Sequence, residues 1–121
     1  MNTTPKILVQ KIADVTVVDI LEARLLDSQE LEALAEQLYQ LVDKLDRKKL
    51  IVDFSRVQFL ASAAIGMVTT LHKKSAAIKG TLVLCGFRKE IMKVFEIMSL
   101  TKLLRFCADE KAALAVFGVS T

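Results

Sequence analysis

The sequence predicts an α/β fold, a single domain in which a mixed sheet of four to five strands is covered by about four helices. Short apolar runs rich in Val, Ile and Leu alternate along the chain with longer segments whose apolar residues recur at helical spacing. Such alternation is typical of sheets that contain parallel strands and carry covering helices. The length of 121 residues fits one domain. Residues 1–121 are therefore expected to fold as one unit, with residues 1–5 and 119–121 frayed.

The N-terminal part of the chain predicts two strands and a helix. Residues 7–13 and 15–21 are rich in β-branched side chains and are separated by Asp14, which indicates two strands joined by a tight turn. From residue 31 to 45, Leu, Ala and Val recur at helical spacing, while Glu, Gln and Lys occupy the other faces. This segment is predicted to be an amphipathic helix that lies against the sheet.

Both ends of this helix carry sequence signals that are typical of helix termini. Asp27 or Ser28 can cap the N-terminus, and Glu30, three positions after Asp27, can complete a capping box. Residues 47–49 are Arg-Lys-Lys, and cations near a helix C-terminus interact favourably with the helix dipole. We therefore expect this basic group to lie at the end of the helix.

The rest of the chain continues the alternation. Apolar runs predict strands at residues 50–54, 81–85 and 103–106, and helical spacing predicts helices at residues 62–78, 88–99 and 110–117. A connection formed by residues 57–60 is expected to lead into the helix that begins at Ser62. We expect Gly80 to supply a left-handed cap after that helix and Asp109 to cap the last one.

Charge and hydropathy exclude several classes of partner. The net charge of +3 comes from short basic groups on separate elements, and the chain has no Trp and one Tyr. A nucleic-acid-binding protein would show a concentrated basic stripe, so no nucleic-acid partner is expected. No signal peptide follows the polar residues 1–6, and the longest uncharged stretch, residues 57–72, is shorter than the ~20 apolar residues of a membrane helix. The protein is expected to be cytoplasmic, without a membrane partner, and monomeric when free.

No residue pattern predicts an enzyme, a metal site or a cofactor. His72 is the single histidine and adjoins two lysines, so a partly solvated side chain is expected rather than a catalytic base. Asp53 closes a strand, where α/β enzymes often keep functional acids. No second acid or histidine is marked beside it, so a loop or cap hydrogen bond is expected. Cys85 and Cys107 lie in apolar stretches without a CxxC pair, which predicts buried free thiols.

Small side chains are concentrated at residues 61–66, which read Ala-Ser-Ala-Ala-Ile-Gly. A glycine inside a helix destabilises it by about 1 kcal/mol relative to alanine, so the presence of Gly66 needs an explanation. One reason is docking, because small residues in the first turn let another surface approach the backbone closely. The other is that Ser62 is simply an N-cap and the small residues pack the helix onto the sheet. Periodicity alone favours the second interpretation.

Three segments carry a resemblance to a known family. Residues 51–66 read as an apolar strand, Asp, a short linker, Phe-Leu, Ala-Ser and further small residues ending in Gly. This resembles the signature of STAS domains, in particular the bacterial anti-sigma factor antagonists, in which Asp-Ser, a small residue, Gly, Leu and Gly follow the aromatic and apolar pair. Residues 22–27 lie where that family has a Gly-Glu-Leu-Asp turn, and residues 87–100 look like its late helix and the leucine after it. The resemblance spans almost the whole chain and implies a STAS-type fold.

The same resemblance implies a protein-binding switch. In this family the serine of the signature is phosphorylated, and that position is Ser62 here. The family's domains bind an anti-sigma factor, often itself a serine protein kinase, and so free the sigma factor for transcription. Phosphorylation blocks this binding, and a serine phosphatase restores it. The partner-binding residues that the resemblance implies are Asp27, Ala61, Ser62, Ala63, Ala64 and Met67.

The chain departs from the family signature at three positions around the serine. Ala61 replaces the signature aspartate, Ala63 replaces a small hydroxyl residue, and Ala64 replaces a glycine. Ala61 has no carboxylate with which to orient the serine hydroxyl or to contact a kinase. Two functions therefore stay open. The first is an antagonist controlled by phosphorylation at Ser62. The second is a STAS interaction subunit that works without phosphorylation, as a signalling scaffold or as the partner of a transport ATPase.

Overall fold

The computed structural model describes residues 6–26 and 28–120. In this part of the chain the elements are β1 (Ile7–Ile12), β2 (Val15–Ile20), β3 (Arg24–Leu25), α1 (Ser28–Asp43), β4 (Lys49–Asp53), β5 (Phe59–Leu60), α2 (Ser62–Ala77), β6 (Thr81–Cys85), α3 (Lys89–Ile97), the 3-10 helix η1 (Leu100–Lys102), β7 (Arg105–Cys107) and α4 (Glu110–Val116). The predicted α/β fold with a mixed sheet and four helices is confirmed.

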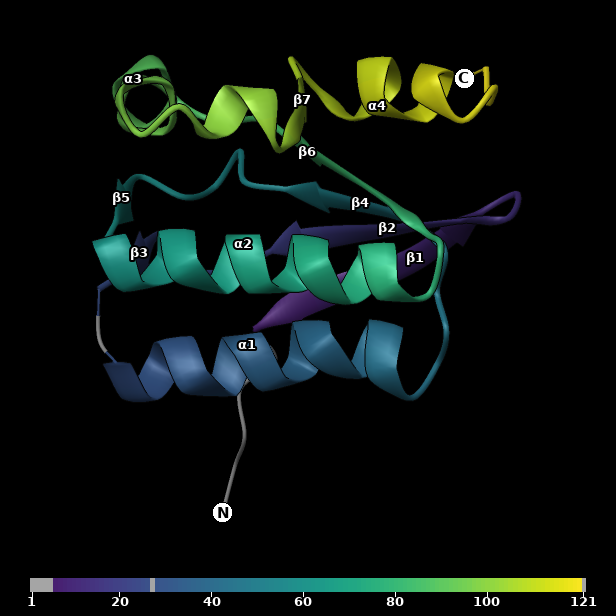
Figure 1. Cartoon of the computed structure of the whole chain (residues 1–121), viewed down its shortest axis with the longest axis horizontal. Helices are drawn as coiled ribbons and strands as arrows, with labels where there is room; N and C mark the ends of the chain where they lie inside the picture. Colours follow the sequence, from purple (N-terminus) through teal and green to yellow (C-terminus); the bar gives the residue numbers. More distant parts are fainter. Residues whose placement is uncertain (1–5, 27, 121) are drawn as a thin grey trace.

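The main sheet has five strands in the order β1-β2-β4-β6-β7. β1 pairs with β2 in antiparallel fashion, whereas β2, β4, β6 and β7 are mutually parallel. Figure 1 shows α1 and α2 lying side by side along one face of this sheet. Buried side chains of α3 join the same core as those of α1 and α2, whereas α4 covers the smaller core on the opposite face. The carboxyl ends of the parallel strands and the start of α2 therefore lie toward the same end of the molecule (Figure 1).

Alternate residues of the central strands supply two hydrophobic cores. On β4, Leu50 and Val52 face the core beneath α1 and α2, and Ile51 faces the smaller core beneath α4. All three side chains are fully buried. Burial on both faces explains why the strand reads as an uninterrupted apolar run instead of alternating with polar residues.

Four phenylalanines join α3 to the sheet. Phe54 stacks on Phe87 with ring centroids 4.3 Å apart. Phe95 of α3 meets Phe87 edge-on at 5.0 Å and Phe106 of β7 at 5.2 Å. Offset and edge-to-face aromatic pairs at such separations stabilise a fold beyond the area they bury. This aromatic cluster therefore fixes the position of α3 against the sheet.

Residues 57–60 are more ordered than the predicted connection. Phe59 and Leu60 form β5, which pairs in parallel with β3 so that Phe59 lies opposite Arg24 and Leu60 opposite Leu25. The Ala61 N–H then donates to the Leu25 carbonyl at 2.9 Å. Two such short strands carry too little sequence pattern to be predicted, because their pairing partner is distant in the chain. Together they hold the entry to α2.

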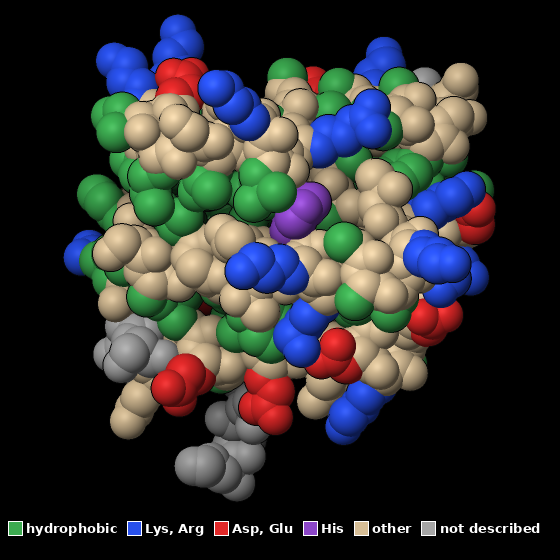
Figure 2. All heavy atoms as spheres, viewed as in Figure 1, with side chains coloured by type: hydrophobic (Ala, Val, Ile, Leu, Met, Phe, Trp, Pro, Cys, Tyr) green, Lys and Arg blue, Asp and Glu red, His purple; other side chains and the backbone are tan. Residues whose placement is uncertain are grey.

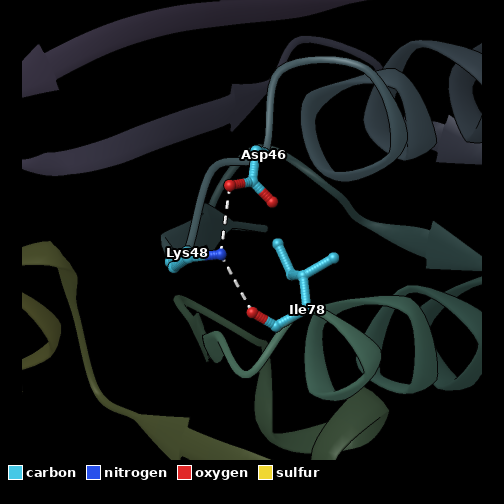
Figure 3. Close-up of polar contacts among 3 residues, drawn as sticks. All are labelled: Asp46, Lys48 and Ile78. Atoms are coloured by element: carbon cyan, nitrogen blue, oxygen red, sulfur yellow. Dashed lines mark hydrogen bonds and ion pairs between the residues drawn. The ribbon is translucent and has the colours of Figure 1, made fainter.

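The prediction that the basic residues 47–49 lie at the C-terminal end of the preceding helix is wrong. α1 ends at Asp43, and no basic residue lies in its last turn. Figure 3 shows where Lys48 lies instead. Its Nζ donates to Asp46 Oδ2 and to the Ile78 carbonyl at the end of α2, both at 3.0 Å. The lysine thus satisfies a terminal carbonyl of α2, which it can reach because the Thr81 N–H donates to the Lys48 carbonyl at 2.7 Å where β4 and β6 begin to pair.

Gly80 is not the left-handed residue after α2, contrary to the sequence prediction. Lys79 has the positive φ of 61°. The glycine is required for a different reason, namely close packing of two backbones. A Cβ at Gly80 would lie 2.7 Å from the Lys48 carbonyl oxygen and 3.0 Å from the Lys48 Cα. The start of β6 can therefore sit against the start of β4 only without a side chain at this position.

Replacing Gly80 with alanine is expected to lower the free energy of unfolding by about 1–3 kcal/mol, because the added methyl forces backbone to move. Urea unfolding followed by circular dichroism measures this change. The matched control is Lys79→Gly, which relieves the left-handed strain of a residue with a side chain and should be neutral or stabilising. Equal destabilisation by both variants would contradict the close-packing explanation.

The helix caps were partly predictable. Asp109 caps α4 as predicted, because its Oδ1 accepts a hydrogen bond of 2.9 Å from the Ala112 N–H. The capping role proposed for Asp27 lies outside the described residues, as do the ends at residues 1–5 and 121.

Near the C-terminus, the Val119 N–H donates to the Leu114 carbonyl at 3.0 Å, and the Val119 side chain packs on the core beneath α4. None of the helices among the described residues combines the length and apolarity needed to span a membrane.

Candidate functional site

The start of α2 presents Ser62 to solvent. Ala61 precedes the helix in an extended conformation, with φ −78° and ψ 158°, and occupies the N-cap position. No side-chain hydrogen bond from the described residues caps this helix end. Ser62 is the first helical residue and is exposed. The interpretation of Ser62 as an N-cap is therefore wrong, and its hydroxyl is available to another molecule.

The small residues that follow Ser62 divide into two sets. Ala63 and Gly66 are exposed, whereas Ala64 is fully buried and Met67 is 6% exposed. A Cβ at Gly66 would have no atom within 4 Å. The exposed set lies within about one turn of Ser62, while Ala64 belongs to the core between the helix and the sheet. The packing explanation is thus confirmed for Ala64, and docking stays a prediction for the exposed Ala63 and Gly66.

A shallow groove lies between α1 and α2, next to Ala63. Its volume is about 250 Å³ and it is lined by Leu31, Glu32, Ala35, Tyr39, Ala63 and Met67. Tyr39 Oη donates to the Met67 carbonyl at 3.4 Å across the groove. The structure therefore brings together Ala63 and Met67, two of the predicted partner-binding residues, and adds a row from α1. Leu31 and Ala35 of this row were missed because helical periodicity assigns them to the core.

Exposed apolar and aromatic side chains continue the surface beyond the start of α2. Phe59 is 50% exposed and Leu26 is 44% exposed. The Arg24 guanidinium lies over the Phe59 ring, 5.0 Å from its centroid. No acidic residue lies in the first turn of α2, so the positive end of the helix dipole is not neutralised from within the turn. Asp27, the remaining predicted contact, lies outside the described residues.

Asp53 is not alone, contrary to the sequence-based expectation. Its Oδ1 accepts a hydrogen bond of 2.8 Å from the Ser55 N–H, which confirms the predicted loop hydrogen bond. Asp19 and Glu110 also lie beside it, with carboxylate oxygens of all three residues within 4.8 Å of one another. Parallel pairing of β2 with β4 places Asp19 opposite Asp53, and α4 begins with Glu110 above them. The signal available in the sequence was an acid near the carboxyl end of two successive strands.

Three carboxylates at this spacing can hold a divalent cation or share a proton. Hydrogen bonding to Asp19, then to Asp53, together with burial, raises the pKa of Glu110 to about 8. A glutamate with that pKa is mostly protonated at neutral pH, and it can then donate to a neighbouring carboxylate. A hydrogen bond from protonated Glu110 to either aspartate would link the start of α4 to the ends of β2 and β4.

The raised pKa of Glu110 predicts that the free energy of unfolding falls as the pH rises from about 4.5 to about 8. In that window the folded chain retains a proton that the unfolded chain has released, so rising pH favours unfolding, at most about 1.4 kcal/mol per pH unit. Glu110→Gln keeps a donor and removes the titration, so its stability should depend less on pH. Urea titrations at pH 5, 6.5 and 8 measure this difference, and Glu96→Gln on the exposed side of α3 is the control. If the free energy of unfolding of Glu110→Gln depends on pH as steeply as that of the parent, Glu110 is not the cause of the pH dependence.

The two cysteines and the histidine lie in surroundings that do not indicate catalysis. Both cysteine thiols are free, as predicted, and Cys85 is buried as predicted, whereas Cys107 is half-buried. Burial raises the pKa of the Cys85 thiol far above its ordinary range. A thiol of this kind is a poor nucleophile, because the thiolate is the reactive form. His72 is half-buried on α2, which agrees with the predicted partly solvated side chain.

Comparisons with known proteins point to one family. A model of the STAS domain matches residues 6–113. BtrV of Bordetella bronchiseptica, provisionally named an anti-sigma factor antagonist, is 30% identical over 86 residues, which are 71% of this chain and 73% of BtrV. An anti-sigma-factor antagonist (STAS) domain protein from Planctomyces limnophilus superposes with a TM-score of 0.79 at 21% identity, over 93% of this chain and 98% of that one. The anti-sigma factor antagonist SpoIIAA in its unphosphorylated form gives a TM-score of 0.70 at 18% identity, over 93% and 99% of the two chains.

Proposed function

The chain belongs to the STAS domain family, and on that premise we propose that it is an anti-sigma factor antagonist controlled by phosphorylation at Ser62. It would bind an anti-sigma factor that is also a serine protein kinase, without catalysing a reaction itself. A serine phosphatase would reverse the modification. The name of BtrV supports the antagonist role. SpoIIAA, which shares the fold at 19% identity, also exists in a phosphorylated form, and this supports the mode of control.

The observation that carries this proposal is the exposed Ser62 at a helix start that no side chain of residues 6–26 and 28–120 caps. A kinase can reach the hydroxyl of such a serine without unfolding the helix. The groove beside Ala63 and the exposed Phe59 support the proposal, because they place accessible apolar surface next to Ser62. Ser62 lies between these two features along the chain, so its modification would act at the centre of the docking surface.

Phosphorylation at this position would change binding without unfolding the domain. A phosphoserine adds roughly −1.5 to −2 charges at neutral pH. The free N–H groups and the dipole of a helix N-terminus stabilise an anion. A partner packed over Ala63 would instead have to desolvate the phosphate, which is unfavourable unless the partner supplies matching cations. Ala64 and Met67 would contribute by shaping the surface from beneath.

One observation favours the second function, a STAS interaction subunit that works without phosphorylation. Ala61 occupies the N-cap position and has no side-chain oxygen to orient the Ser62 hydroxyl. A signalling scaffold or a transport ATPase would then use the same groove and the same exposed residues. Recovery of such a partner from the native lysate, together with the absence of an anti-sigma factor, would favour this function.

The two functions are distinguished by phosphorylation with the cognate kinase. The purified chain is incubated with the kinase and ATP, the phosphate is mapped by mass spectrometry, and binding is measured before and after. We expect phosphate on Ser62, none on the Ser62→Ala variant, and loss of binding that a serine phosphatase reverses. Unmodified Ser62 after complete ATP turnover would exclude control by this kinase.

Gly66→Ala is expected to separate stability from binding. The added methyl meets no atom within 4 Å, and alanine is the better helix former, so the free energy of unfolding should rise by about 1 kcal/mol. The same methyl projects from the proposed docking face, so affinity for the partner should fall. Thermal unfolding and isothermal titration calorimetry measure the two effects. If Gly66→Ala is stabilised as expected but binds the partner with unchanged affinity, Gly66 does not lie in the docking surface.

A further inference from the structure

A second hollow lies on the face between α2 and the β6–β7 edge, away from the start of α2. It has a volume of about 240 Å³ and is lined by His72, Ser75, Ala76, Gly80, Thr81, Leu82 and Arg105. Figure 2 shows the single histidine, in purple, set into this face between the layers, with Lys or Arg side chains close by. The hollow exists because β7 begins opposite Val83, which leaves Thr81 and Leu82 of β6 without a residue of β7 beside them.

The polar groups of this hollow have unsatisfied bonding capacity. Ser75 is 1% exposed, and its Oγ has no hydrogen-bond partner among the described residues. A serine in a helix commonly bonds the carbonyl four residues earlier, and Ser75 does not do so. A buried polar atom without a partner is unfavourable, and it commonly marks the place of a bound water, ion or ligand. Ser75 is therefore an independent indication that something polar occupies this hollow.

The charges around the hollow point to the sign of the ligand. Arg105 lines it and forms no ion pair with any residue that the structure describes. His72 also lines it and can donate from its ring nitrogen. No lining side chain is acidic. An arginine without a carboxylate partner and a ring N–H donor favour an oxyanion, which arginine binds through two parallel hydrogen bonds.

The size of the hollow limits the ligand that it can take. The hollow is smaller than pockets that enclose drug-sized molecules, which begin at about 300 Å³. It matches a single phosphate or carboxylate group with a few waters.

We propose that the hollow formed by His72, Ser75 and Arg105 binds a phosphate or carboxylate group. Arg105 holds the anion from the open side, His72 donates to it, and Ser75 supplies a hydroxyl from the floor. The site is independent of the proposed anti-sigma function, because its residues lie on the second half of α2 and on β6 and β7. Its failure would leave the role of Ser62 unaffected.

Nuclear magnetic resonance of the full chain tests this site with two probes, inorganic phosphate and acetate, each at constant ionic strength set with sodium chloride. We expect saturable shifts of the Gly80, Thr81 and Leu82 amides on the order of 1–10 mM, as suits a ligand of few non-hydrogen atoms. Saturation by phosphate alone identifies a phosphate site, and saturation by acetate identifies a carboxylate site. Shifts that stay linear with both probes would overturn the proposal.

Three variants locate the binding. Arg105→Met keeps the aliphatic stem and removes the charge, and it should weaken binding about tenfold or more, the loss of a charged hydrogen bond. Ser75→Ala should also weaken binding, and it should raise the thermal stability of the anion-free protein because the unsatisfied hydroxyl is gone. Arg88→Met, at an exposed arginine before α3, is the matched control and should bind as the parent does. Unchanged affinity in Arg105→Met would overturn the assignment, and the spectra themselves report whether each variant is folded.

Discussion

Replacing Ser62 with aspartate is expected to reduce affinity for the anti-sigma partner at least about tenfold, which corresponds to 1.4 kcal/mol. The new carboxylate lies on an exposed helix start beside the groove lined by Ala63 and Met67. A partner that covers this surface must remove water from the charge, and an uncompensated charge in an interface is strongly unfavourable. The fold should be unaffected or slightly more stable, since an acid in the first turn of a helix contributes about 0.3–1 kcal/mol.

Two control variants separate charge from shape and from overall electrostatics. Ser62→Asn has nearly the shape of aspartate without its charge, and it should bind more tightly than Ser62→Asp. Thr70→Asp places the same charge on an exposed position of the same helix, two turns away, and should leave affinity near that of the parent. Calorimetric titration of the partner into each variant provides the comparison. Equal binding by Ser62→Asp and the parent would remove Ser62 from the docking surface.

Phe95→Ala is expected to have the largest effect on stability, a loss of about 3–5 kcal/mol in the free energy of unfolding. Phe95 is fully buried, and its ring meets Phe87 at 5.0 Å and Phe106 at 5.2 Å. Truncation removes both aromatic contacts and leaves a cavity between α3 and the sheet. A domain of this size has only about 5–15 kcal/mol to lose, so a large fraction of its stability depends on one ring.

Urea unfolding followed by circular dichroism is the suitable measurement, because the chain has no tryptophan to report by fluorescence. Phe95→Leu provides a milder variant in case the alanine protein does not fold. Ile97→Ala on the same helix is the matched control. Ile97 is 82% exposed, so its truncation should change stability by no more than about 0.5 kcal/mol. Similar losses from Phe95→Ala and Ile97→Ala would show that α3 does not depend on the aromatic cluster.

The sequence by itself determined the order and kind of the main elements. Residues 50–54 were recognisable as a buried strand because burial on both faces leaves an unbroken apolar run. Asp109 was recognisable as a cap because a cap bonds an N–H only three residues away. The signature at residues 51–66 located the start of α2 and Ser62. These features depend on neighbours within a few positions, which is the range over which a sequence pattern carries structural information.

Only the tertiary structure decided which residues meet across long separations. The clearance at Gly80 is set by the backbone of Lys48, and Lys48 itself reaches the end of α2. Asp19, Asp53 and Glu110 converge because parallel pairing aligns two strand ends beneath α4. The division of the small residues near Ser62 into exposed Ala63 and buried Ala64 depends on how α2 packs on the sheet. Such contacts follow from packing and register, which bring together residues that are far apart in the chain.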